Sequence, residues 1–173
     1  MGRTSTKRDK SVYQIAREKM ELSREKAAEL AQLDASKIER IENGKSQPGP
    51  WDVIAMAEAY KKPELCNYYC ANECPIGMKY VPEIKLKELP QVILEMISSL
   101  NSMKKSQERL IEIGADGEIR DHELEDFIRI QNELEGISAT VESLRIWTQK
   151  MLATGKINVE QYKKLKEAED AHS

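Results

Sequence analysis

The stretch "ASKIERIENGK" at residues 35–45 decides how the N-terminal part of this chain folds. Ile38 and Ile41 recur at the spacing of one helical face, which predicts a short amphipathic helix with its apolar side turned inward. Asn43 and Gly44 follow, and both tolerate the left-handed backbone that commonly ends a helix. The stretch is therefore predicted to be a capped helix inside a small helical domain.

Charged side chains surround the apolar face of this helix. Lys37, Arg40 and Lys45 fall outside that face and are expected to point to solvent. Asp34 precedes the helix and is a candidate N-cap. A cation-bearing helix of this kind is suited to the major groove of DNA, and the alternative is a helix that only packs a domain used for protein contacts.

Short helices are predicted on both sides of this stretch. Residues 11–20 carry an apolar face, and Ser23 is a suitable N-cap for a second helix over residues 24–31. Pro50 favours the first position of a fourth helix, and a last turn or two is expected over residues 64–69. The side chains expected to face the core are Val12, Ile15, Ala16, Met20, Ala27, Ala28, Leu30, Ile38, Ile41, Val53, Ile54, Met56, Ala57 and Tyr60.

Proline and glycine interrupt the pattern over residues 75–88, a charged and poorly periodic segment that is expected to be a linker. Beyond it, two long helices carry residues at alternating spacings of four and three, which is typical of a packing seam. The turn at residues 114–117 is short enough to require an antiparallel hairpin, and a final helix is expected over residues 158–171. The predicted seam positions are Leu89, Ile93, Met96, Leu100, Met103, Gln107 and Leu110, and then Phe127, Ile130, Leu134, Ile137, Val141, Leu144, Thr148 and Met151.

The apolar stripe of the hairpin is wider than one seam, because Val92, Ile97, Ile111, Ile128 and Trp147 extend it. Something else must cover this surface: the final helix, the N-terminal domain or the same surface of a second subunit. We expect the second subunit to be the main partner, in a homodimer formed through residues 89–152.

Charge is distributed unevenly along the chain. The net charge is −3, yet residues 1–62 hold 13 Lys and Arg against 10 Asp and Glu, so the remainder is acidic. Residues 1–10 are predicted to form a basic flexible arm able to neutralise phosphates, although a solvated terminus is an equal alternative. Apolar runs of membrane-spanning length are lacking in the sequence, which leads us to expect a cytoplasmic protein.

The segment "LSREKAAELAQLDASKIERIENGKSQP", residues 22–48, followed by a fourth amphipathic helix, resembles the phage-repressor-like (Xre-type) helix-turn-helix family. The most specific part is "IERIENGK" at residues 38–45, and the likeness extends from about Val12 to Lys62. The resemblance implies a five-helix, lambda-repressor-like DNA-binding domain whose third helix lies in the major groove of double-stranded DNA, usually as a dimer.

The resemblance also implies a role for individual residues. Ala35, Ser36 and Lys37 stand where base edges are read. Phosphates would be held by Ser23, Arg24, Arg40, Asn43 and Lys45. The chemistry of these residue types agrees with the roles, since Lys and Arg neutralise phosphate and a Ser hydroxyl bonds a base edge.

The chain departs from the family pattern in three respects, one of which is that residues 1–62 are only mildly basic, so modest affinity per subunit and a need for dimer avidity are expected. Gln32 stands where the family commonly has Gly, and a side chain in left-handed geometry costs about 1–2 kcal/mol, so a rearranged turn is one expectation. Asp34, Glu39 and Glu42 would be repelled by phosphates unless they turn to the core or pair with cations. These carboxylates support an alternative class, an antitoxin-like or phage accessory module that binds protein and not DNA.

Three cysteines are spaced four apart in "CNYYCANEC", which would place them on one helical face. Cys66, Cys70 and Cys74 are therefore candidate thiolate ligands or a redox-sensing group, and a thiol- or metal-responsive regulator is a further alternative. Structural zinc needs a fourth ligand and usually closer spacing, so buried, inert thiols and no metal or other cofactor are the main expectation.

The whole chain is thus predicted to be all-α: a helix-turn-helix DNA-binding domain over residues 11–74, the linker, and a hairpin for dimerisation or effector response with a short C-terminal helix over residues 89–173. The sequence offers neither a nucleophile–base pair nor a phosphate-cradling glycine loop, so we do not expect an enzyme. The predicted function is a sequence-specific transcriptional regulator, a repressor that binds operator DNA as a dimer.

Overall fold

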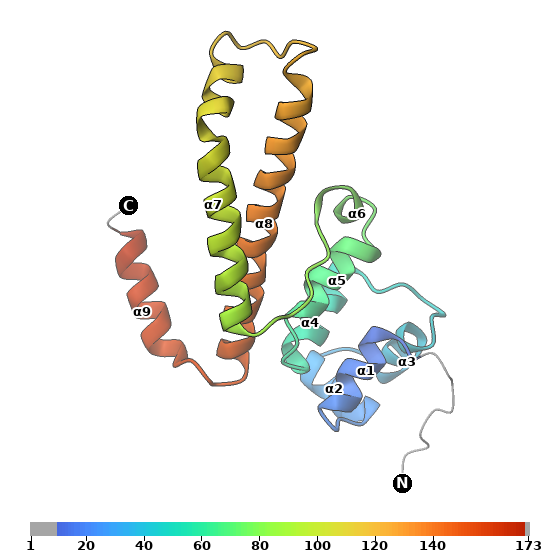
Figure 1. Ribbon diagram of the computed structural model, residues 1–173. Helices are drawn as coiled ribbons and strands as arrows, with labels where there is room; N and C mark the ends of the chain where they lie inside the picture. The colour runs from blue at the N-terminus through green and yellow to red at the C-terminus, as the bar shows by residue number, and fades with distance from the viewer. Residues whose placement is uncertain (1–9, 172–173) are drawn as a thin grey trace. The chain divides into compact units, whose positions relative to one another are not determined.

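Nine helices make up the regular structure of residues 10–171, the part of the chain that this computed structural model describes (Figure 1). The all-α fold class predicted from the sequence is confirmed. The predicted basic arm lies outside the described residues except for its last residue. The helices are α1 Val12–Lys19, α2 Arg24–Ala31, α3 Ala35–Glu42, α4 Pro50–Ala59, α5 Glu64–Asn72, α6 Gly77–Tyr80, α7 Leu89–Gly114, α8 Leu124–Ala153 and α9 Val159–Asp170.

The chain divides into two compact units. One holds the residues up to 83 together with those from 148 onward, and the other holds residues 84–147. Within residues 10–171, every helix lacks the combination of length and apolar character that a bilayer-spanning segment needs.

Local signals in the sequence explain where the first helices begin. The Ser23 hydroxyl oxygen accepts a hydrogen bond from the Lys26 N–H at 3.1 Å and so caps α2, as predicted. The N-cap of α3 differs from that of α2. Asp34 occupies the N-cap position of α3 with extended backbone, as predicted. Its exposed side chain does not form the expected cap bond to the free N–H groups of the helix.

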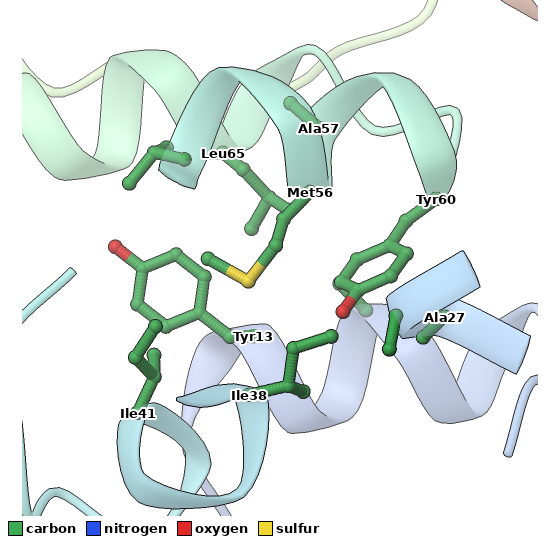
Figure 2. Packing of buried hydrophobic residues seen from close by; sticks show 11 residues of the cluster. Tyr13, Ala27, Ile38, Ile41, Met56, Ala57, Tyr60 and Leu65 are labelled. Carbon is green, nitrogen blue, oxygen red and sulfur yellow. The ribbon is translucent and has the colours of Figure 1, made fainter. Parts of the chain in front are cut away.

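The core of the N-terminal helices lies where α1, α3, α4 and α5 meet, and Figure 2 shows its side chains. Ile38 and Ile41 of α3 point inward, as predicted, and contact a layer that includes Met56 and Tyr60 of α4. Small side chains on α2 allow close approach of its neighbours. The buried cluster consists of Tyr13, Ala16, Ala27, Ala28, Ile38, Ile41, Val53, Met56, Ala57, Tyr60 and Leu65.

Three residues expected in this core are exposed instead: Ile15, Leu30 and Ile54. On α1 the Tyr13 ring fills the core in place of Ile15, and on α2 the buried position falls on Ala31. A short helix with apolar residues on several sides does not show by its spacing which side faces inward. Tertiary packing chose the side in each case.

Residues 75–88, expected to be a linker, contain the single turn of α6. Gly77 of α6 lies against α5, so closely that a Cβ on it would be 2.1 Å from the Cys70 carbonyl oxygen. The Asn67 side-chain amide donates to the Pro82 carbonyl oxygen at 3.0 Å, which holds the segment after α6 near α5. Only glycine permits this approach, because the obstructing atoms belong to backbone.

Helices α7 and α8 form an antiparallel hairpin, as predicted (Figure 1). Near its turn, Arg109 of α7 donates from Nε to Asp126 Oδ2 of α8 at 2.7 Å. One turn further along, Arg129 of α8 donates from Nη1 to the Ser106 hydroxyl at 3.0 Å. These two bonds connect α7 to α8 at this end of the hairpin.

The predicted seam of the hairpin is wrong at three of the seven α7 positions and at two of the eight on α8. Ile93 (44% exposed), Leu100 (52%) and Gln107 on α7 face solvent, as do Leu134 (44%) and Val141 (53%) on α8. The buried positions of α7 are Val92, Ser106 and Ile113. They share the seven-residue repeat of the predicted line but are displaced from it by one residue, and the spacing alone did not distinguish the two lines.

Two buried tyrosines give a matched prediction about the stability of the N-terminal helices. The Tyr60 hydroxyl is buried and lacks a hydrogen-bond partner among residues 10–171, whereas the Tyr13 hydroxyl donates to Glu73 Oε2 at 3.0 Å. We expect Tyr60→Phe to leave the free energy of unfolding unchanged or raise it by up to about 1 kcal/mol, and Tyr13→Phe to lower it by about 1–2 kcal/mol. Denaturant titration measures both, and equal losses in the two variants would contradict the assignment.

The same tyrosine predicts a decline of stability at high pH. Burial, with a smaller contribution from Glu42, raises the pKa of Tyr60 from 10.0 to about 12. Above pH 10 the unfolded chain loses this proton while the folded chain keeps it, so the free energy of unfolding falls as the pH rises from 10 towards 12. In Tyr60→Phe, the free energy of unfolding should fall less over that range. Tyr13, whose pKa is also raised, should account for part of the fall that is left.

Candidate nucleic-acid interface

Helices α2 and α3 are joined by a tight turn, and the start of α2 lies beside the end of α3, where Arg24 bonds to Glu42. Gln32 adopts left-handed backbone, with φ 53° and ψ 40°, and the Leu33 N–H donates to the Ala28 carbonyl oxygen at 3.0 Å. The turn is therefore closed with Gln32 itself in the left-handed conformation, and the rearrangement expected at Gln32 does not occur. The strain of about 1–2 kcal/mol for a side chain in this conformation is accepted at this position.

Helix α3 has one apolar side and one polar side. Ile38 and Ile41 are buried, while Ser36, Glu39 and Arg40 are exposed on the opposite side. The helical spacing of the exposed residues, three and four apart, makes them neighbours on a single surface. This surface is the polar side of α3.

The polar side of α3 continues past the end of the helix. Asn43 is the C-cap, and Gly44 follows with φ +67°, a backbone conformation that disfavours any side chain. The chain then folds back, and the Lys45 N–H donates to the Arg40 carbonyl oxygen at 2.8 Å. Lys45 is thereby held beside the end of α3 with its side chain exposed.

Glu42 does not belong to the polar side of α3, because its side chain is fully buried. Arg17 of α1 donates to both of its carboxylate oxygens, from Nε to Oε1 at 2.5 Å and from Nη2 to Oε2 at 2.9 Å. Arg24 of α2 adds a third bond, from Nε to Oε2 at 2.8 Å. One of the three carboxylates expected to repel phosphate is thus neutralised inside the domain.

The Arg17 guanidinium also bonds to the backbone, in addition to its two bonds to Glu42. Its Nη1 donates to the Leu22 carbonyl oxygen at 2.6 Å, so the guanidinium joins the turn between α1 and α2 to the end of α3. The bond to Glu42 is the largest influence that raises the pKa of Arg17. A fork-to-fork pair of this kind fixes geometry as well as charge.

Ser23 and Arg24 open α2 at the same surface. The Ser23 hydroxyl oxygen accepts the cap bond from the backbone, and the Ser23 side chain also hydrogen-bonds to the Glu25 carboxylate. A backbone hydrogen bond, together with this bond from Ser23, lowers the pKa of Glu25. The Arg24 side chain is 28% exposed, so part of its guanidinium reaches solvent while Nε bonds to Glu42. Arg24 can therefore donate to an anion placed beside the N-terminus of α2.

Lys37, in the first turn of α3, is not a free cation. Its Nζ lies 2.6 Å from Asp52 Oδ1 of α4, and the Asp52 Oδ2 atom accepts from the Gly49 N–H at 2.8 Å. Burial acts to raise the pKa of the Asp52 carboxyl, but these two hydrogen bonds together outweigh it and lower that pKa. Ala35, at the start of α3, is half-buried and packs against the core.

Arg40 and Lys45 carry the uncompensated positive charge of the surface. Both side chains are exposed, and within residues 10–171 neither forms an ion pair. They flank the end of α3, whereas the paired Lys37 lies at its beginning. The structure thus brings the eight predicted residues to α2, α3 and the segment after α3, but with Arg24 and Lys37 already paired.

Sequence reasoning missed two residues that shape this surface. Arg17 lies on the buried side of α1, where an isolated charge signals a buried partner. Asp52 follows Gly49 by three residues at the start of a helix, a spacing typical of a capping box. Neither signal identifies the partner, because each partner is distant in sequence.

The three cysteines are half-buried, free thiols. Burial, together with the neighbouring Cys70, raises the pKa of the Cys66 thiol, which disfavours the reactive thiolate. Among the described residues, no grouping of three or more His, Cys, Asp or Glu side chains is arranged to hold a metal ion.

Comparison with known protein families found one match. Residues 14–69 match the family model of a helix-turn-helix domain. The matched residues run from α1 into α5 and include the whole of the α2–turn–α3 unit. The comparisons with curated proteins and with solved structures found no match.

Proposed function

We propose, from the premise that residues 14–69 form a helix-turn-helix DNA-binding domain of the Xre-like family, that this chain is a transcriptional repressor that occupies operator DNA as a homodimer. Domains of this family are typically non-enzymatic. The proposal includes DNA contacts to bases and phosphates, a dimer interface on the hairpin, and a cytoplasmic location together with the DNA.

The observation that carries the proposal is the sorting of charge around α3. Arg40 and Lys45 are exposed and unpaired among the described residues, while the Glu42 carboxylate is turned inward. Two unpaired cations available to phosphates support DNA binding over a module that only binds protein, although Asp34 and Glu39 remain exposed at the same helix. The proposed contacts are Ser23, Arg24, Ala35, Ser36, Lys37, Arg40, Asn43 and Lys45.

The proposed contacts divide into two kinds. Ser36, near the start of α3, faces outward and can reach a base edge, with Ala35 and Lys37 beside it. Arg40 and Lys45 are suited to phosphates, and so is the partly exposed Arg24 at the N-terminus of α2, with Ser23 preceding it, beside the end of α3. Such phosphate contacts would fix the register of α3 in the groove.

The double variant Arg40→Ala, Lys45→Ala tests the DNA contacts. We expect affinity for duplex DNA to fall at least about tenfold near 0.1 M salt, and the slope of log affinity against log salt to become shallower by about two, since two phosphate contacts are lost. Fluorescence anisotropy titrations measure both quantities. Lys19→Ala, which removes an exposed cation from the end of α1, is the control and should change neither quantity.

Selection of bound sequences from a random DNA pool tests sequence recognition and symmetry together. A dimer should return a motif with two half-sites about one helical repeat apart, 34–36 Å from centre to centre, or a multiple of it. If the purified protein enriches no sequence and its affinity for duplex DNA at low salt equals that of serum albumin, the proposed function is rejected.

The proposed dimer interface lies on the hairpin. Ile97 and Leu100 on α7, and Leu134 and Val141 on α8, are large apolar residues with about half of their surface exposed. At about 100° per residue, each pair lies on one flank of its helix, and in an antiparallel hairpin these two flanks fall on the same side. A contiguous apolar face on a charged helix pair is typical of an interface, and a second copy offers the same face.

A further inference from the structure

The ion pair between Lys37 and Asp52 connects the start of α3 with the start of α4. The Lys37 Nζ and Asp52 Oδ1 atoms are 2.6 Å apart, and the Lys37 side chain is 38% exposed, compared with 12% for Asp52. The pair is therefore at the edge of the proposed DNA surface, with the carboxylate on the inner side and the ammonium on the outer side.

The carboxylate is the fixed member of this pair. Its second oxygen, Oδ2, accepts from the Gly49 N–H at 2.8 Å, and Asp52 is the third residue of α4, where the partial positive charge of the helix N-terminus favours an anion. Lysine, by contrast, has a long flexible stem. Lys37 therefore adapts its position to Asp52, and not the reverse.

We propose that Asp52 is a specificity-determining residue of the DNA surface, because it holds the Lys37 ammonium away from non-specific phosphate contacts and presents it at one place beside α3. This inference rests on the proposed function. Asp52 itself is largely covered by protein and need not touch DNA.

The physical reason concerns how the two kinds of binding use a cation. Non-specific binding gains from any cation that can reach a phosphate, and each such contact adds to the salt dependence. A lysine held by a carboxylate contributes little to that attraction, yet its remaining N–H groups can still donate to a base edge that lies in the right place. Arg40 and Lys45 lack such a partner among the described residues and supply the general attraction.

Asp52→Asn tests the inference with little change of shape, because the Asn side-chain oxygen can still accept from the Gly49 N–H. We expect affinity for a random-sequence duplex near 0.1 M salt to rise about fivefold, with a salt slope steeper by about one. Affinity for the sequence selected from the random pool should rise less. The ratio of specific to non-specific affinity should therefore fall.

Two controls separate release of Lys37 from a general change of charge. Glu39→Gln removes one exposed negative charge from α3 without touching the pair, and should raise both affinities by the same factor. In a Lys37→Ala background, Asp52→Asn should change the specificity ratio less than about twofold, because the released ammonium is then missing. Circular dichroism of each variant should show unchanged helix content.

The inference is overturned if Asp52→Asn acts like Glu39→Gln, or acts equally with and without Lys37, while the wild-type protein binds its selected sequence. That result would leave the proposed function intact. If the wild-type protein has no attraction for duplex DNA at low salt, the proposed function fails and the inference fails with it.

Discussion

Replacing Glu42 with alanine lowers the free energy of unfolding of the N-terminal helices by about 3–5 kcal/mol, the usual cost of removing one partner from a buried ion pair. Glu42 is fully buried and accepts two bonds from Arg17 and one from Arg24. Without the carboxylate, the Arg17 guanidinium stays buried with only the Leu22 carbonyl oxygen as acceptor. A loss of this size is a large fraction of the stability of a small domain.

Urea titration followed by circular dichroism measures the change, with Glu39→Ala as the matched control on the same helix. Glu39 is exposed, so its removal should change the free energy of unfolding by less than about 0.5 kcal/mol. A loss for Glu42→Ala no greater than that of the control would show that the cluster contributes little to the fold.

A second variant distinguishes the cost of leaving Arg17 without its partner from the cost of removing the volume of the Glu42 side chain. Glu42→Leu combined with Arg17→Met replaces the buried ions by apolar side chains, and such replacements are often close to neutral. We expect this double variant to be more stable than Glu42→Ala. Its ratio of specific to non-specific DNA affinity should nevertheless decrease, because Arg24 loses the carboxylate that holds its Nε.

Replacing Leu100 with lysine converts the proposed dimer to a monomer and lowers operator affinity by about a hundredfold. Leu100 is half exposed on the apolar flank of α7, so the charge does not disturb the inside of the hairpin, but a second copy would have to bury it. The two DNA-binding domains then bind independently, and the gain from linking two sites, about 10²–10⁴, is lost.

Analytical ultracentrifugation and DNA titration test this prediction together. Ser98→Lys is the matched control, because Ser98 is exposed on the same helix and lies two residues from Leu100, on a different side. The control should remain a dimer with unchanged affinity. A wild-type protein that is monomeric at micromolar concentration, or a Leu100→Lys variant that stays dimeric, would exclude this face as the interface.

The sequence was sufficient for the positions of the helices other than α6 and for which side of α3 is exposed. Ser23, Pro50 and the Asn43-Gly44 pair act through their own backbone or that of close neighbours, so their effect on helix ends is local and readable. The helical spacing of Ile38 and Ile41 likewise specifies which side of α3 is buried.

Only the tertiary structure decided where the long charged side chains go and which apolar line closes the hairpin. Glu42 and Lys37 each find a partner on another helix, Arg17 and Asp52, and nothing in the spacing within α3 identifies those partners. The seam of α7 falls on Val92 and Ser106, not on Leu100. The sequence did not identify this seam, because α7 offers two lines of residues with the same seven-residue period. Packing against a partner helix selects between such lines, and that selection is a long-range interaction.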